Sequence, residues 1–309
     1  MLPIIANYSI KDLERLSGVK AHTIRIWEQR YSILKPERTD SNIRLYRDHE
    51  LRMLLNISLL IRHGSKISHV SRLSSQEICL KVQQLVKSPA SSNEYFDAQI
   101  DNLVFAMLDI DASATNAIFD SAISRFGVEQ TIMALIIPFL SRVGMMWSTG
   151  EASVFQEHFL TNLIRERVIV EISNCKNQEV DSGDCYVLFL PEAELHEMGL
   201  LFASYLLKKR GKRVIYLGQN MPLFEIIQFS NLYKPTYLLT FFTAGYSFGS
   251  IKEYITEISG KVLHSTILIA GSSHQQGALP LVDNVCFLKH VEDLISIAER
   301  PVDLKNSGN

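Results

Sequence analysis

The chain has 309 residues, more than one compact hydrophobic core usually holds, which suits two or three domains. Its composition of 47% hydrophobic and 21% charged residues, with a mean hydropathy of +0.07, excludes an intrinsically disordered chain. The net charge of −2 conceals an asymmetry, because residues 1–75 hold 13 Lys and Arg against 7 Asp and Glu. A basic head on an acidic body indicates that only the head meets a polyanion.

The sequence argues against a membrane protein, a secreted protein and a protein with a structural zinc site. No apolar run reaches the roughly 20 residues of a membrane span, and the first residues lack the pattern of a secretory signal. The cysteines form no CxxC pair, which argues against a disulfide framework or a structural zinc site. We therefore expect a cytoplasmic protein, which associates with the nucleoid through its basic head.

The head is predicted to be a winged helix-turn-helix domain over residues 1–75. Ser9 caps a first helix that Gly18 ends, and a second helix is expected at about residues 22–29. Turn-forming residues within 36–42 separate two short extended pieces, as in a hairpin wing. A further helix, capped by Asp48, follows.

The second helix of such a unit enters the major groove, where arginines contact phosphates or guanine edges. The side chains that we expect to face DNA come from this helix and the wing: Lys20, Thr23, Arg25, Arg30, Tyr31, Arg38, Arg44 and Tyr46. The stretch TIRIWEQRYSILKPERTDSNIRLYRDHEL resembles the DNA-binding domain of MerR-family transcription regulators. The resemblance implies a dimer on double-stranded, pseudo-palindromic operator DNA. The metal-sensing cysteine pair of some MerR proteins is missing, so the sensor must lie elsewhere.

A linker and a helical domain are expected next. Residues 76–93 are predicted to be a linker, since KSPASSNE is rich in Ser, Pro and Ala. Helical periodicity then gives four helices with short loops, which predict a four-helix bundle over residues 94–175. The helices are expected near 94–109, 112–125, 128–146 and 152–173.

From Asp184 onward, strand-like and helix-like segments alternate. The runs CYVLFL, RVIYLG, TYLLTFF and STILIAG, with a weaker one at NVCFLK, are separated by helical patterns. This alternation predicts a doubly wound, Rossmann-like α/β domain with a parallel sheet over residues 182–303. Ligands of such folds bind beyond the carboxyl ends of the strands, and EAELHEMG directly follows the first strand.

His196 in EAELHEMG can serve as a base, a metal ligand or a hydrogen-bond donor. A base needs a nearby nucleophile, and a zinc site needs further ligands, which the neighbouring residues do not supply. An axial ligand to a metal held in a macrocycle needs one histidine and an acceptor to orient its ring, and Glu194 can be that acceptor. Gly199 would let the backbone approach a bulky ligand.

Glu194, His196 and Gly199 together resemble the (D/E)xHxxG motif of cobalamin-binding domains. The resemblance implies that His196 is the lower axial ligand of cobalt and that the nucleotide tail of the cofactor threads into the sheet. The SxL and GG elements of that family correspond here to Thr240-Phe241-Phe242 and Ala270-Gly271. The expected cofactor contacts are therefore Glu194, His196, Gly199, Thr240 and Gly271.

The SxL and GG elements depart from the family pattern. Phe242 replaces a smaller aliphatic residue, and Ala270 adds a methyl group beside the tail. Thr243 and Ser247 are alternative hydroxyls. A second hypothesis is therefore a MerR-type regulator whose α/β domain does not bind cobalamin and serves oligomerisation or another ligand.

Between the third and fourth bundle helices, Trp147 is followed after nine residues by Glu157-His158. This resembles the W-x9-EH signature of bundles that cover adenosylcobalamin in light-sensing MerR-type repressors. The resemblance implies that Trp147 lies over the cofactor, that Glu157 and His158 address its hydroxyls and the upper face of cobalt, and that His158 becomes the upper ligand once light removes the adenosyl group.

The leading hypothesis is a repressor that senses adenosylcobalamin and light, assembles into a dimer or tetramer, and is not an enzyme. A third hypothesis is the corrinoid carrier module of a methyltransferase or mutase. Such an enzyme needs a substrate domain, whereas this chain has a basic winged head instead.

Overall fold

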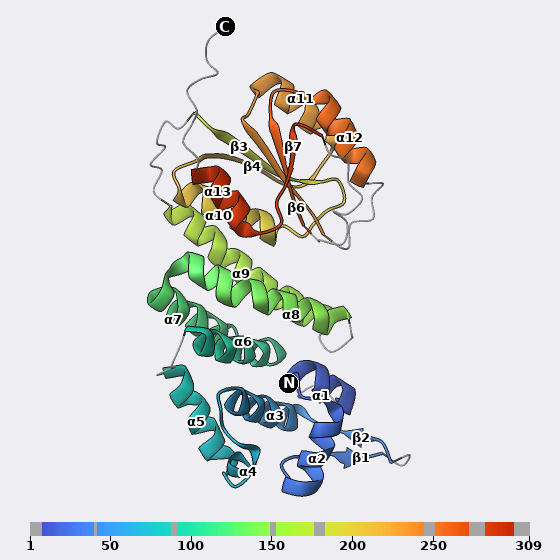
Figure 1. Cartoon of the computed structure of the whole chain (residues 1–309), viewed down its shortest axis with the longest axis vertical. Coiled ribbons are helices and arrows are strands. Elements are labelled where there is room, and N and C mark those ends of the chain that lie inside the picture. The colour runs from blue at the N-terminus through green and yellow to red at the C-terminus, as the bar shows by residue number, and fades with distance from the viewer. Residues whose placement is uncertain are drawn as a thin grey trace. The chain divides into compact units, whose positions relative to one another are not determined.

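The computed structural model describes residues 8–39, 42–87, 92–148, 153–175, 183–243, 251–271 and 282–299. They belong to two compact units, Met1–Ile164 and Arg165–Asn309. Figure 1 shows helices throughout the first unit and a sheet flanked by helices in the second. The multidomain α and α/β architecture predicted from the sequence is confirmed.

The head has the predicted helix-turn-helix and wing. Helix α1 begins with a capping box between Ser9 and Asp12, and Gly18 ends it in the left-handed conformation at φ 72°. The wing is a two-stranded antiparallel hairpin, of which Asp40 and Ser41 lie outside the described residues. The elements are α1 (Ile10–Ser17), α2 (Ala21–Tyr31), β1 (Glu37–Arg38), β2 (Arg44–Leu45) and α3 (Asp48–Arg62).

The expected linker contains a helix. After the short α4 (Ile67–Val70), helix α5 (Ser75–Lys87) occupies most of the stretch that the sequence analysis treated as connecting chain. Ser74 and Glu77 form reciprocal hydrogen bonds at its start, and Ile78 and Val82 on one face are buried. The linker prediction is wrong there because apolar residues four positions apart pack against the head and bundle.

The bundle helices agree with the predicted ones. Asp111 caps the second helix by accepting a hydrogen bond from the amide of Ala114, and Gly127, at φ 79°, breaks the helical path where a loop was expected. The elements are α6 (Ser92–Leu108), α7 (Ala112–Thr131), the π-helical turn η1 (Ile132–Ile136), α8 (Ile137–Ser148) and α9 (Val154–Asn174).

One helical stretch of the described chain, Ala112–Gly144, is long and apolar enough to cross a membrane by length and composition. It comprises α7, η1 and most of α8, and it is interrupted at Gly127. Phe119 and Phe139 within it are fully buried in the protein. A core helix of a bundle meets the same criteria, so this stretch is weak evidence for a membrane span.

The second unit contains a five-stranded sheet in the order β4-β3-β5-β6-β7, in which every pair is parallel. One face packs against α10 and α13 and the other against α11 and α12, as Figure 1 shows. The strands are β3 (Cys185–Pro191), β4 (Arg213–Met221), β5 (Tyr237–Phe242), β6 (Thr266–Gly271) and β7 (Val285–Phe287). The helices are α10 (Met198–Lys209), α11 (Leu223–Tyr233), α12 (Ile251–Lys261) and α13 (Val291–Glu299).

Gly271, at the carboxyl end of β6, is expected to tolerate no side chain. Its φ is 136°, and a Cβ added there would lie 1.9 Å from the carbonyl oxygen of Phe242. We expect Gly271→Ala to lower the free energy of unfolding by about 2 kcal/mol in urea denaturation followed by circular dichroism. Gly260→Ala in α12 is the control, because its Cβ would meet nothing within 4 Å and alanine favours the helix. Equal effects of the two variants would contradict the prediction.

Candidate functional site

The predicted ligand motif lies at the topological switch point of the sheet. Strand β3 pairs with β4 on one side and with β5 on the other, so the connections after β3 and β5 leave the sheet in opposite directions. Glu194 and His196 follow β3, and Thr243 follows β5. The carboxyl ends of these neighbouring strands bring the three residues together, at the position where open α/β sheets bind ligands.

Glu194 is the centre of this cluster. Its side chain is only 1% exposed, and its Oε1 accepts a hydrogen bond from the His196 amide at 3.0 Å and lies 2.7 Å from His196 Nδ1. Its Oε2 accepts hydrogen bonds from the amide of Thr243 at 3.0 Å and from the Thr243 hydroxyl at 2.7 Å. The His196 side chain is 72% exposed. One ring nitrogen is therefore held by a carboxylate, while Nε2 has no partner among the described residues.

The pKa of Glu194 is lowered from its ordinary value of 4.5. Burial alone would raise this pKa, but the hydrogen bonds from His196 and Thr243 to the ionised carboxylate outweigh it. The ionised carboxylate thus stabilises the folded state above the unfolded pKa, and this contribution disappears as pH falls through the lower, folded pKa.

We therefore expect Glu194→Gln to destabilise the protein most at pH 7. The difference in free energy of unfolding between wild type and variant should shrink as the pH falls below about 4.5, since the carboxylate of the unfolded wild type takes up a proton while the folded one is still ionised. The shrinkage ends at the lower, folded pKa. Urea denaturation at a series of pH values measures this difference. A difference that stays constant down to the folded pKa would contradict the assignment of an ionised Glu194.

Glu197, a buried residue that the sequence analysis did not single out, lies next to this cluster. Its carboxylate pairs with the Arg165 guanidinium and accepts a hydrogen bond from the Tyr216 hydroxyl at 3.1 Å. It also precedes α10 directly, so these bonds fix the start of the helix that carries Gly199. The sequence signal that could have identified Glu197 is its position directly after His196, as a second acidic residue beside this histidine.

The remaining motif positions differ in what surrounds them. Thr240 is fully buried, and its hydroxyl has no partner among the described residues, so the alternative Thr243 supplies the hydroxyl that bonds Glu194. Ser247 lies outside the described residues. Phe242 is buried in the core between the sheet and α11 and α12. The ring of Phe241 lies 3.0 Å from where a Cβ on Gly199 would stand.

The W-x9-EH residues belong to two bundle helices. Trp147 is in the last turn of α8, and its side chain lies outside what the structure describes. Glu157 and His158 are in the first turns of α9, where the Glu157 carboxylate bonds His158 Nδ1 and accepts a hydrogen bond from Thr161 at 2.8 Å. The imidazole of His158 is exposed and is oriented by a carboxylate, as that of His196 is. Its role as an upper ligand stays a prediction.

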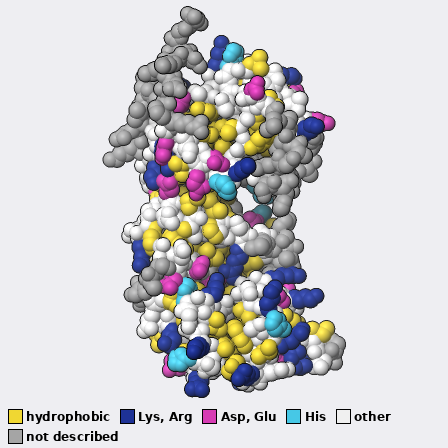
Figure 2. Space-filling model, viewed as in Figure 1, with side chains coloured by type: hydrophobic (Ala, Val, Ile, Leu, Met, Phe, Trp, Pro, Cys, Tyr) yellow, Lys and Arg dark blue, Asp and Glu magenta, His cyan; other side chains and the backbone are white. Residues whose placement is uncertain are grey.

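Basic side chains gather over the head, as Figure 2 shows toward the lower end of the view. Arg25 and Arg30 are exposed on α2, while Thr23 is partly buried. Lys20 pairs with Glu14 at 3.2 Å, and Arg38 donates a hydrogen bond to Asn42 in the wing at 2.6 Å. The DNA contacts of these residues stay predictions.

Tyr46 is not available to DNA, which corrects the prediction. It is fully buried, its backbone pairs with Tyr8, and its hydroxyl donates to Glu28 at 3.2 Å. Arg44 pairs with the same carboxylate at 3.0 Å. Glu28 thus fastens the wing to α2, and Tyr46 is an aromatic residue of the head core.

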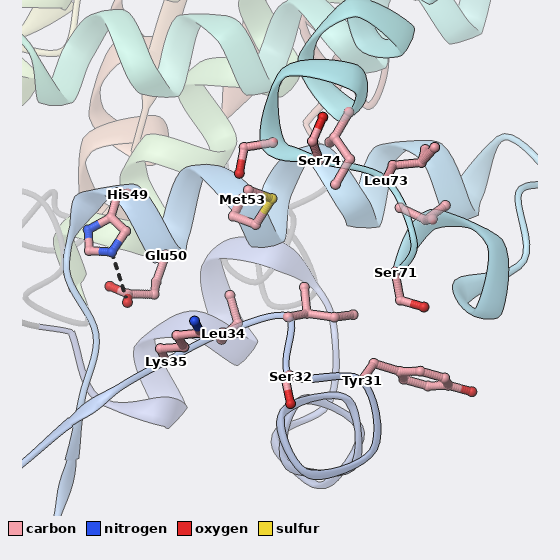
Figure 3. Close-up of a pocket in the computed structure, with 14 residues that line it drawn as sticks. Tyr31, Ser32, Leu34, Lys35, His49, Glu50, Met53, Ser71, Leu73 and Ser74 are labelled. Carbon is pink, nitrogen blue, oxygen red and sulfur yellow. Dashed lines mark ion pairs between the residues drawn. The ribbon is translucent and has the colours of Figure 1, made fainter.

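Tyr31 lines a hollow of about 350 Å³ between the end of α2, the start of α3 and the segment joining α4 to α5. Figure 3 shows its ring beside Ser71, with Lys35, His49 and Glu50 at the other end of the hollow. His49 and Glu50 form an ion pair there at 2.9 Å. Tyr31 is the last residue of α2 and lines this hollow. Its contact with DNA stays a prediction.

Two family models match the chain. Residues 8–77 match the MerR HTH family regulatory protein, and residues 99–170, which form the bundle, match a B12 binding domain. The chain therefore contains a MerR-type helix-turn-helix domain followed by a B12 binding domain. This combination agrees with the head and bundle predicted from the sequence.

Curated relatives and a solved structure extend these matches. The transcriptional repressor CarH of Myxococcus xanthus is 28% identical over 70% of this chain and 72% of its own length, and CarA of the same organism is 24% identical over 69% and 68%. A monomethylamine corrinoid protein of Methanosarcina barkeri has a TM-score of 0.53 at 14% identity, covering 65% of this chain and 96% of that one, which shows a shared fold. These relatives make the chain a DNA-binding transcription regulator rather than an enzyme.

Proposed function

We propose that this regulator represses transcription in response to cobalamin, which it binds through His196. The observation that carries the proposal is the buried Glu194, which holds Nδ1 of an exposed His196 at the switch point of the sheet. The names of CarH and CarA, both transcriptional repressors, support repression as the output.

The groups at this site fit a corrinoid. In the described part of the chain, no group of three or more His, Cys, Asp and Glu could hold a bare metal ion, but one histidine suffices when a macrocycle supplies the other ligands. A carboxylate on the second ring nitrogen is the usual support for such a ligand. We assign His196 to cobalt, Glu194 to its orientation, and the unpartnered hydroxyl of Thr240 to the nucleotide tail. Gly199 and Gly271 are the further proposed contacts, although the Phe241 ring and the Phe242 carbonyl occupy the space beside them in this structure.

One observation favours the second hypothesis, regulation without cobalamin. The ring of Phe241 fills the space against Gly199, and Ala270 lies opposite Phe241 in the β5–β6 register. A cofactor tail on this face of the sheet requires the Phe241 ring to move. If it does not move, the α/β domain serves oligomerisation or binds another ligand.

We further propose adenosylcobalamin as the sensed form and light as the signal. The support is the pattern of Trp147, Glu157 and His158, with an indole to cover the cofactor and an exposed, oriented imidazole to replace the adenosyl group. The bound cofactor supplies a light-sensitive cobalt–carbon bond. The regulator would act in the cytoplasm at the nucleoid, as a dimer or tetramer on operator DNA. The proposed DNA contacts are Lys20, Thr23, Arg25, Arg30, Tyr31, Arg38 and Arg44.

Absorption spectra and mobility shifts test the proposal. The full-length chain mixed with adenosylcobalamin in the dark should give the spectrum of histidine-bound cobalt and should retard duplex DNA that it has selected from a random pool. Green light should change the spectrum and release the DNA. Retarded DNA with no spectral change for any cobalamin would favour the second hypothesis, and a spectral change with no retarded DNA would contradict the repressor.

A further inference from the structure

The exposed face of α2 carries one large apolar side chain. Ile26 is 50% exposed, whereas Ile24 and Trp27 on the opposite face are buried in the head core. Ile26 is near the middle of this helix, which is the second helix of the helix-turn-helix. The fold of the head therefore leaves about half of Ile26 exposed to solvent.

Polar and basic side chains surround Ile26 on that face. His22 is four residues before it, and Gln29 and Arg30 are three and four residues after it, so all three are its neighbours on the helix surface, and all are exposed. Arg25, also exposed, precedes it directly. Single exposed apolar residues are common. Ile26 differs from such residues because it lies among hydrogen-bond donors, on the helix face that is predicted to enter a DNA groove.

The major groove offers one apolar group, the C5 methyl of thymine. Nothing else on the base edges of unmodified DNA has the chemistry to bury an isoleucine, since the other groups there are hydrogen-bond donors or acceptors. The contacts predicted for the arginines of α2, with phosphate or guanine, do not depend on Ile26. An isoleucine at the centre of this face thus adds discrimination that the basic residues do not provide.

We infer that Ile26 reads a thymine methyl group and so specifies a T·A pair at one position of each half-site. The inference depends on DNA binding by the head and not on cobalamin. Burial of one methyl group corresponds to a change in affinity of about fourfold per contact. Because Ile26 is exposed and alanine favours helix formation, Ile26→Ala should leave the fold of the head intact.

A thymine-to-uracil scan tests the inference, because uracil lacks only the C5 methyl group. Duplex DNA selected from a random pool by the wild-type chain is remade with each thymine replaced singly by deoxyuridine, and binding is measured for wild type and for Ile26→Ala. We expect one position per half-site at which wild type loses about fourfold in affinity and Ile26→Ala loses nothing.

The matched comparison is Arg25→Ala, which should weaken binding but retain the loss at that uracil. Equal uracil losses in wild type and Ile26→Ala at every position would overturn the inference. A selection that enriches no sequence would overturn it too, because it would show that α2 reads no bases. Circular dichroism of Ile26→Ala confirms that the variant is folded.

Discussion

Asp101→Ala is expected to lower the free energy of unfolding of the first unit by about 3 kcal/mol. The Asp101 side chain, in α6, is only 4% exposed and accepts hydrogen bonds from Arg62 of α3 at 2.8 Å and from Arg142 of α8 at 2.6 Å. Arg142 also donates to the Leu16 carbonyl near the end of α1. Removing one partner of a buried ion pair typically costs 3–5 kcal/mol, and the partial exposure of Arg62 places this case at the lower end.

Asp109→Ala is the matched control, because Asp109 joins the same two parts of the protein through Arg52 of α3. That pair is 47% and 39% exposed, so its loss should cost less than about 1 kcal/mol. Urea denaturation of the full chain, followed by helical circular dichroism, measures both variants. Equal losses would show that Asp101 contributes no more than a surface charge.

This carboxylate also joins head and bundle. Arg62 lies at the end of α3 in the head, whereas Asp101 and Arg142 belong to the bundle. Arg142 is five residues before Trp147 on α8. The helix that ends at the predicted cofactor cap therefore contacts the helix-turn-helix directly. Asp101→Ala should for this reason alter DNA binding along with stability.

The elements could be predicted because local signals marked their ends. Gly18 and Gly127 each interrupt a helix and Asp111 caps one where the sequence indicated, and the apolar runs marked every strand of the five-stranded sheet. Helix α5 was missed because KSPASSNE, which begins at the last residue of this helix, resembles a linker, although Ile78 and Val82 have helical spacing. In that stretch the Ser, Pro and Ala residues were given more weight than the helical spacing of the apolar residues.

The site could be predicted only where a motif is contiguous. Glu194 and His196 are two residues apart, so their pairing followed from the sequence, whereas the choice of Thr243 over Thr240 depends on where β5 ends. Burial of Tyr46 and the ring of Phe241 against Gly199 are tertiary contacts that no local pattern encodes. The same holds for Asp101, which looks like any polar residue on an amphipathic helix.

His196→Ala is expected to weaken binding of adenosylcobalamin by at least about 100-fold. Loss of a residue that only orients a metal ligand costs 10–100-fold, and loss of the ligand itself should cost no less. Glu194 would then also retain its buried carboxylate without the imidazole that it orients. Titration followed by visible absorption measures the change, since the spectrum of histidine-bound cobalt should be absent from any residual complex.

His264→Ala separates this effect from a general loss of imidazole. His264 is also exposed, but it precedes β6 and so lies at the amino ends of the strands, whereas His196 lies at their carboxyl ends. It should bind as the wild type does. Undiminished binding by His196→Ala with an unchanged spectrum would place cobalt elsewhere. Undiminished binding could also come with the spectrum of cobalt ligated by the base of the cofactor's own nucleotide tail. That result would mean that the tail does not enter the sheet, and the Phe241 ring against Gly199 would then have no reason to move.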